Sequence, residues 1–205
     1  MRLVRSRSSV LALLAGMALA SPAALTAQKQ LRRVDAVSYP ARILIIRHAE
    51  KPPAPSRSVD LAPEGVARAK RLHELFEASP TRPKPLPRPD FIFATRDTKQ
   101  SHRPSETAAA LGASLHLDVD TRFGDKHVKG LAREILTVPK YAGKTVLIVW
   151  HQGTIPDLAK ALGADDAPDS WKDSVFDRVW EITYNRNGEA FFESHKQHLT
   201  SADAK

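Results

Sequence analysis

Two histidines in the sequence directly follow short runs of apolar residues. The segment RILIIRHAEK places Arg47 and His48 after four apolar β-formers, and the segment TVLIVW ends at His151. A histidine ring nitrogen can act as a nucleophile or base near neutral pH, and an arginine can bind an oxyanion through two parallel hydrogen bonds. These residue types indicate chemistry on an oxyanion such as a phosphoryl group.

The elements around these residues are predicted to bring them together. Short apolar runs are typical of strands buried on both faces of a parallel sheet, and ligands of such sheets bind outside the carboxyl ends of the strands. Arg103 begins a predicted helix after a strand over residues 90–94 and is expected at the same rim, where a helix N-terminus favours phosphate. The sequence has no carboxylate cluster of metal-ligand spacing beside these residues, so no metal is expected.

The rest of the chain alternates between strand and helix patterns. Pro63 opens a helix with an apolar stripe, and Arg68 on its other side is expected to face water. Further helices are predicted over 103–111, ending at Gly112, around 128–136 and over 155–162. A short strand is predicted over 115–119, and two strands, 178–184 and 189–193, flank Asn187-Gly188 as a hairpin. This order predicts an α/β fold: a three-layer α/β/α sandwich with a mostly parallel central sheet and a C-terminal antiparallel hairpin.

Residues 1–27 have the pattern of a secretory signal peptide, with three arginines, the apolar run Val10–Ala20 and small residues after it. The run is too short to span a bilayer, which takes about 20 residues; an uncleaved anchor is the alternative. Cleavage is expected after Ala27, with Ala20 as the second candidate. Residues 28–40 would be a tether and 41–205 the domain, periplasmic or secreted and free of the membrane.

Composition narrows the function classes. The 205 residues include no cysteine, which excludes disulfides and thiolate chemistry. The net charge of +8 falls to +5 without residues 1–27. Because aromatic residues are not interleaved with these cations, no nucleic-acid partner is expected. The sequence carries no signal for the oligomeric state.

Three motifs carry a resemblance to a known family. Arg47-His48-Ala49-Glu50 resembles the RHG/RHA signature of the histidine phosphatase superfamily, the phosphoglycerate mutase-like proteins. The segment RPSETA, which begins at Arg103, is similar to the family's R-x-x-x-T-A element, and His151 in VWHQG is similar to its second histidine. Order and spacing agree over residues 42–163.

The resemblance implies a phosphatase that needs no cofactor and no metal, and the signal-peptide pattern predicts that it is exported. His48 would take the phosphoryl group as phosphohistidine, and Arg47, Arg103 and His151 would hold the phosphoryl oxygens. The substrate would be a phosphorylated small molecule or a phosphoprotein. A non-catalytic cell-envelope protein that binds phosphorylated ligands in the same pocket is the first alternative. A mutase is the second, and this chain lacks the large insertions expected of a mutase lid.

The sequence departs from the family pattern in two places. The family's serine after the second strand is replaced by Thr95, and the interval from Arg96 to His102 is longer than usual. Its residues Arg96, Ser101 and His102 either contact phosphate or form a loop, and a loop is favoured for Arg96.

The second departure concerns the proton donor. Gln152 occupies the place after the second histidine where some relatives have an aspartate, so the acid must lie elsewhere. The candidates are Asp118, Asp120, Asp125 and Glu134, and Asp125 is preferred because it lies in a predicted turn. The walls of the site are expected from residues 51–58, 96–102 and 122–129, and no pattern in these loops identifies the substrate.

Overall fold

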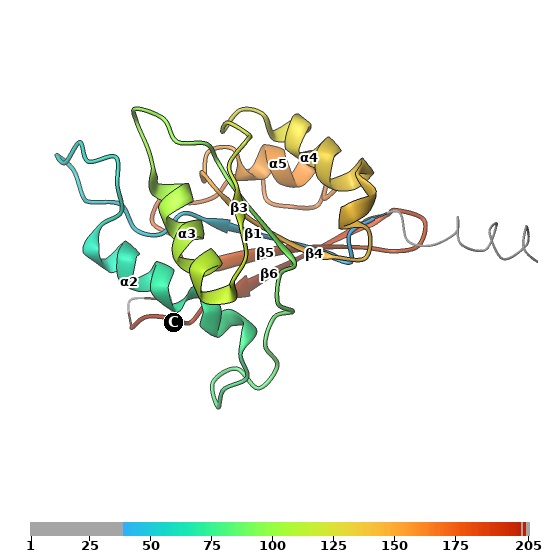
Figure 1. Ribbon diagram of the computed structural model, residues 1–205, viewed down its shortest axis with the longest axis horizontal. Coiled ribbons are helices and arrows are strands. Elements are labelled where there is room, and N and C mark those ends of the chain that lie inside the picture. The colour runs from blue at the N-terminus through green and yellow to red at the C-terminus, as the bar shows by residue number, and fades with distance from the viewer. Residues whose placement is uncertain (1–38, 202, 204–205) are drawn as a thin grey trace, which may run out of the picture. The chain divides into compact units, whose positions relative to one another are not determined.

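Six strands form one sheet in a computed structural model that describes residues 39–201 and 203 (Figure 1). Their order across the sheet is β3-β2-β4-β1-β5-β6. The strands are β1 (Arg42–Arg47), β2 (Phe91–Ala94), β3 (Val119–Asp120), β4 (Thr145–Trp150), β5 (Arg178–Tyr184) and β6 (Ala190–Lys196). The apolar runs predicted as buried strands are thus β1 and β4, at the centre of the sheet.

Four neighbouring strands, β3, β2, β4 and β1, run parallel to one another. β5 is antiparallel to β1 and to β6. The turn between β5 and β6 contains Gly188 at a φ of +82°, a conformation that favours glycine, as expected for Asn-Gly. The predicted three-layer α/β class with a C-terminal hairpin is confirmed.

Helices cover both faces of the sheet (Figure 1). The α-helices are α2 (Pro63–Arg71), α3 (Arg103–Leu115), α4 (Val128–Thr137) and α5 (Ile155–Ala161). Two 3₁₀ helices, η1 (Leu72–Phe76) and η2 (Pro139–Tyr141), follow α2 and α4. Side chains of η1 and α3 pack on one face of the sheet, and those of α4 and α5 pack on the other. This arrangement leaves the carboxyl ends of the parallel strands at one rim.

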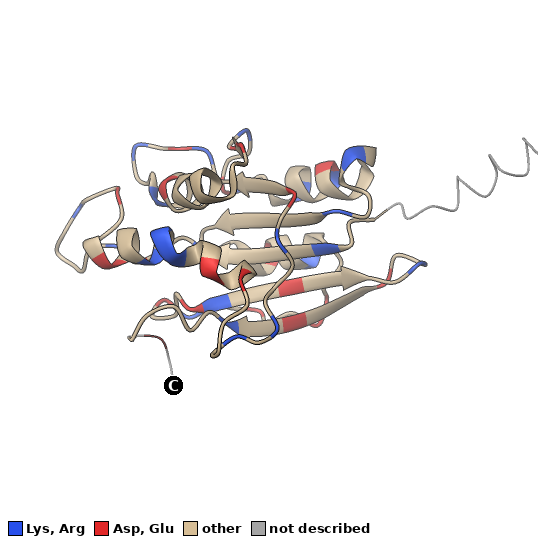
Figure 2. Ribbon diagram, turned by 60° about the horizontal axis from the view of Figure 1, so that its bottom comes forward, with Lys and Arg blue, Asp and Glu red and all other residues tan. Residues whose placement is uncertain are grey.

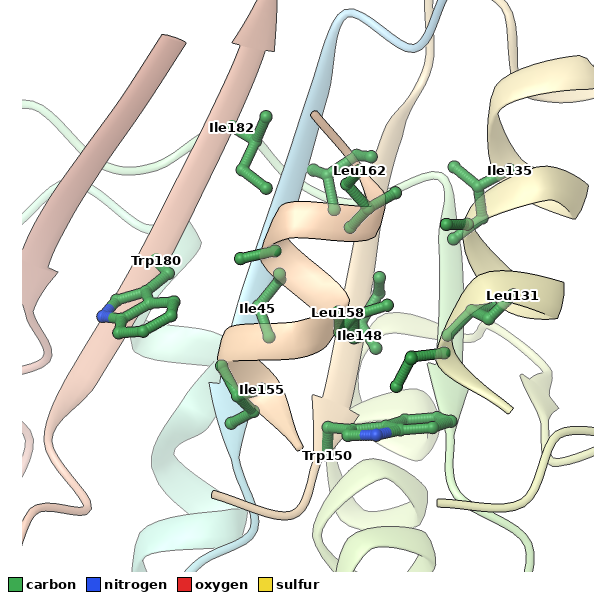
Figure 3. Close-up of a cluster of buried hydrophobic side chains, with 14 of the residues drawn as sticks. Ile45, Leu131, Ile135, Ile148, Trp150, Ile155, Leu158, Leu162, Trp180 and Ile182 are labelled. Carbon is green, nitrogen blue, oxygen red and sulfur yellow. The ribbon is translucent and has the colours of Figure 1, made fainter. Parts of the chain in front are cut away.

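Alternation along the strands separates two hydrophobic cores. Ile43 and Ile45 of β1 join α4 and α5 in one core, whereas Leu44 and Ile46 join η1 and α3 in the other. Figure 3 shows the first core, in which Trp150 and Trp180 frame the aliphatic side chains of α4 and α5. Strands β2 and β4 carry no charged residue (Figure 2), in keeping with burial on both faces.

Helix α3 corrects one prediction. It continues through Gly112 to Leu115, and His116 follows in the left-handed region at a φ of +54°. A Cβ on Gly112 would lie 2.7 Å from the carbonyl oxygen of Leu117, so the glycine permits close packing of the following loop and does not cap the helix. The strand predicted over 115–119 is consequently reduced to β3, Val119–Asp120.

Arg68 corrects another prediction, because it is 3% exposed. Its guanidinium donates to Glu50 Oε1 at 2.8 Å and Gln197 Oε1 at 3.2 Å, and also contacts Asp203. These partners make a buried position favourable for a cation. We call Arg68 with Glu50, Gln197 and Asp203 the Arg68 cluster.

The described residues fall within one compact unit, Val37–Lys205. The expected signal peptide and nearly all of the expected tether lie in residues 1–38, outside the described residues. Within the described part of the chain, no helix has the length and apolar character needed to cross a membrane.

Candidate active site

The two histidines lie side by side at the carboxyl ends of β1 and β4. The strands pair in parallel with Arg47 opposite Trp150, so that His48 and His151 are the next residue in each chain. The backbone N–H of His48 donates to the carbonyl oxygen of Trp150 at 3.0 Å and extends the ladder by one bond. The ring centroids are 5.3 Å apart, with an angle of 72° between the planes. The structure therefore brings together the histidines that the sequence assigned to one rim.

The ring of His48 is held in one orientation. His48 is 2% exposed, and its Nδ1 lies 2.7 Å from the carbonyl oxygen of Ala49. Since only a protonated Nδ1 can donate to that oxygen, the contact favours the tautomer in which Nε2 carries a free lone pair. Burial lowers the pKa of His48 to about 3. The hydrogen bond to Ala49 raises this pKa, and the charges of Arg47, His151 and Arg103 lower it further. The ring is thus neutral at pH 7.

Thr107 ties this segment to α3. The backbone N–H of Ala49 donates to Thr107 Oγ1 at 3.0 Å, and that hydroxyl donates to the carbonyl oxygen of Arg103 at 2.7 Å. The threonine of the R-x-x-x-T-A motif thus lies one helical turn after Arg103 and fixes the residue that orients His48.

Arg47 lies beneath a segment that precedes β5. Its Nη1 donates to the carbonyl oxygens of Asp173, at 2.6 Å, and Val175, at 3.2 Å. The ring of Phe176 stacks on the guanidinium, with its centroid 3.9 Å from Cζ. Nε and Nη2 of Arg47 are buried without a hydrogen-bond partner among the described residues. Burial lowers the pKa of Arg47 to about 10, so it remains a cation at pH 7.

Arg103 is the first residue of α3 and reaches the same rim. Its Nη1 donates to the carbonyl oxygen of Ser58 at 3.1 Å, whereas Nε is buried and unpaired within the described chain. Burial lowers its pKa, and the carboxylates of Glu106 and Asp60 oppose this effect. Arg47 and Arg103 thus each present buried N–H groups that an anion could satisfy.

His151 is half-buried next to Asp125. Burial lowers the pKa of His151, and the charge of Asp125 is the main influence that opposes this. The carboxylate of Asp125 accepts the hydroxyl of Thr154, and its backbone carbonyl accepts the indole N–H of Trp150 at 3.2 Å. Asp125 therefore lies at the site, on the side of His151.

The other three candidate acids have different surroundings. Asp120 and Glu134 are both paired with Arg122, at 2.8 Å and 3.1 Å, and Asp118 is exposed. Of the four candidates, Asp125 is the one whose charge is felt by His151.

The interval from Arg96 to His102 forms a turn and does not gather around the histidines. Thr98 and Ser101 exchange backbone hydrogen bonds, and the ring of His102 pairs with Asp60 at 2.9 Å. Ser101 is buried and lies next to the backbone N–H of Arg103. Arg96 is exposed, as expected for a loop residue.

Two groups of residues could hold a cation. Asp60, His102 and Glu106 place ligand atoms within 4.8 Å of one another, as do Glu181, Glu193 and His195. In the first group Glu106 already accepts the N–H of Leu61 at 2.8 Å. His102 also pairs with Asp60, and His195 pairs with Glu181, so hydrogen bonds within each group account for its arrangement.

Sequence reasoning missed Phe176 at the site and assigned no role to Thr95. Phe176 lies 6.2 Å from His48, ring centroid to ring centroid, and Thr95 Oγ1 is buried without a partner in the described residues. Phe176 precedes β5 in a segment without a periodic pattern, so no signal identified it. Thr95 directly follows β2, and the end of that strand was visible in the sequence. A polar residue at this position could have been included among the candidate site residues.

No family model matches the sequence, and no curated protein matches it. Solved structures do match. A structure described as an alpha-ribazole-5'-P phosphatase from Escherichia coli aligns with a TM-score of 0.54 and 14% identity, over 78% of this chain and 99% of that one. Phosphoglycerate mutase from Bacillus anthracis aligns with a TM-score of 0.52 and 15% identity, over 80% and 95%.

A third match is a structure described as the phosphohistidine phosphatase SixA from Agrobacterium tumefaciens. Its TM-score is 0.50 and its identity 17%, over 77% of this chain and 97% of that one. All three belong to the histidine phosphatase superfamily. At these identities the likeness establishes the fold, which is the one that the sequence motifs implied.

Proposed function

Because the chain has the phosphoglycerate mutase-like fold, we propose that it is a phosphatase that hydrolyses phosphomonoesters through a phosphohistidine on His48. One observation carries the proposal. His48 presents a neutral ring with Nδ1 tied to Ala49, beside buried and unpaired N–H groups of Arg47 and Arg103. Buried donors without partners are costly, and a phosphoryl dianion would satisfy them.

The first step is an in-line displacement at phosphorus. Nε2 of His48 forms a bond to phosphorus while the bond to the leaving-group oxygen breaks, and that oxygen gains a proton. Arg47, Arg103 and His151 would hold the three equatorial oxygens, where charge is spread in the loose transition state. In the second step water attacks phosphorus, the P–N bond breaks, and inorganic phosphate and neutral imidazole are released.

Asp125 is our candidate for the proton donor. It lies beside His151, and the hydroxyl of Thr154 fixes its carboxylate. As a general acid it would protonate the leaving-group oxygen, and as a base it would then take a proton from the attacking water. In many phosphatases, metal ions stabilise the negative charge of the phosphoryl group. In this proposal two guanidinium groups and an imidazole have that role, so no metal is required.

The test is release of p-nitrophenol from p-nitrophenyl phosphate in EDTA. We expect the wild type to turn over and His48→Ala to be inactive, whereas His73→Ala, which changes a partly exposed histidine on η1, should match the wild type. Acid-labile phosphate should be trapped on the wild type and not on His48→Ala. Phosphate binding without turnover or adduct would instead support a non-catalytic binding protein.

Export is a separate part of the proposal. The pattern of residues 1–27 supports secretion to the periplasm or beyond. If the full chain is expressed in a Gram-negative host, N-terminal sequencing of the periplasmic fraction should begin at Gln28. Recovery of uncleaved chain in the cytoplasm would contradict export.

A further inference from the structure

Beyond the phosphoryl pocket, Arg96 and His127 converge on the turn at Gly124. A Cβ on Gly124 would lie 3.1 Å from Nδ1 of His127 and 3.5 Å from Nη2 of Arg96. The absence of a side chain at Gly124 therefore lets both groups approach the same small region. Their backbones are fixed as well, because Arg96 N–H donates to the Phe123 carbonyl at 2.8 Å and His127 N–H donates to that of Gly124 at 2.9 Å.

Neither side chain has a protein partner in the described part of the chain. No hydrogen bond or ion pair joins the guanidinium of Arg96 or the imidazole of His127 to another described residue. The two nearby carboxylates are engaged: Asp125 accepts the hydroxyl of Thr154, and Asp97 accepts that of Ser105. A cation and a histidine thus face the same space without an acid between them.

The turn at Gly124 places this pair next to the phosphoryl pocket. Gly124, on which Arg96 and His127 converge, directly precedes Asp125, and the charge of Asp125 acts on His151. The Arg96 side chain therefore lies on the Asp125 side of the site, where a leaving group would depart. On the opposite side, Phe176 and the backbone of Asp173 already cover Arg47.

We propose that Arg96 and His127 form a second anion subsite, and that the substrate is a phosphomonoester whose leaving group carries a further anionic group. The inference rests on the proposed function, because it assigns the leaving group of that reaction. A charge-assisted hydrogen bond from Arg96 would both orient the ester and select for the second charge.

The test compares three aryl phosphates with leaving phenols of similar acidity: phenyl phosphate, 3-carbamoylphenyl phosphate and 3-carboxyphenyl phosphate. We expect kcat/KM of the wild type to be roughly tenfold higher for the carboxylate than for the neutral amide. Arg96→Gln should abolish this preference and leave turnover of phenyl phosphate unchanged. Arg133→Gln, an exposed arginine on α4, is the matched control and should keep the preference.

Two further measurements sharpen the test. The preference should shrink as ionic strength rises, because an exposed charge pair is screened. Gly124→Ala should also reduce it, since the new Cβ would displace both side chains without a change in charge. Equal kcat/KM for the carboxylate and the amide in the wild type would overturn the subsite and leave the phosphatase intact. No turnover of any ester would overturn the proposed function and this inference with it.

Discussion

The Arg68 cluster yields a prediction whose size follows from the structure. Arg68→Met keeps the aliphatic stem and removes a guanidinium that is 3% exposed and contacts four side chains, those of Glu50, Gln197, Thr200 and Asp203. The carboxylate of Asp203, 2% exposed, would then be buried without its cation. Removal of one partner of a buried ion pair typically costs about 3–5 kcal/mol, a large part of the stability of a domain.

The matched control is on the same helix. Arg71→Met removes an exposed arginine whose partner is Glu74, three residues away, and should cost less than about 1 kcal/mol. Urea and thermal unfolding measure the loss of stability in both variants. We expect the Tm of Arg68→Met to fall by on the order of 10 °C. The double variant Arg68→Met/Asp203→Asn should recover part of the loss. Equal destabilisation by Arg68→Met and Arg71→Met would refute the reasoning.

The pH dependence has a defined sign. Burial alone would raise the pKa of Asp203, but hydrogen bonds from Arg68, Thr200 and the Leu199 backbone outweigh it and hold the pKa well below the usual range. A carboxyl with a lowered folded-state pKa stabilises the fold above its unfolded pKa, about 3.9, and loses this contribution as pH falls below that value. The stabilisation of the wild type by Asp203 should therefore be constant from pH 7 to 5 and decline below about pH 4. The stability difference from Arg68→Met should begin to shrink at higher pH, because burial without the guanidinium raises the pKa of Asp203 in the variant.

Three further predictions concern the site. In an NMR titration the ring carbon resonances of His48 should keep their neutral-form shifts from pH 8 to about 4, because its pKa is lowered to about 3; a midpoint near 6.5 would contradict this. The free energy of unfolding should also fall as pH drops below 6.5, since the ring gains its proton in the unfolded state first. Thr107→Val removes the hydroxyl that fixes Ala49 and should lower kcat by on the order of tenfold, whereas Thr137→Val, which removes an exposed hydroxyl on α4, should not; equal rates for the two would exclude a positioning role. Asp125→Asn should slow hydrolysis of an alkyl phosphate, which needs a protonated leaving group, far more than that of p-nitrophenyl phosphate; equal slowing of both would argue against a general acid.

The rim of the sheet was predictable because the signals for it are local. Continuous apolar runs identified β1 and β4, and the histidines that follow them inherit their positions from the strands. The start of α3 at Arg103 was local as well, since a proline in the first turn marks it. The fold class and the proximity of the two histidines both followed from these runs.

The errors arose where distant residues decide the outcome. Helical periodicity placed Arg68 on the polar side of α2, but Gln197 and Asp203, more than a hundred residues away in sequence, provide a buried environment for it. Gly112 looked like a helix end, yet it is needed for the approach of Leu117 to α3. Phe176 reaches the site from the segment before β5, which is the neighbour of β1 in the sheet but distant from it in sequence, and no sequence pattern connects Phe176 to Arg47.

The central position of β1 has a consequence for how the molecule folds. β1 lies near the start of the described chain, yet its neighbours in the sheet are β4 and β5, with Arg42 opposite Thr145 and Thr183. Pairings of such large sequence separation close long loops and make folding slow. The two histidines can meet only after β4 has been synthesised, and β1 gains its second neighbour only with β5. A chain that remains unfolded until nearly all of it has emerged would suit the export that we propose, because the reactive centre would form only after transport across the membrane.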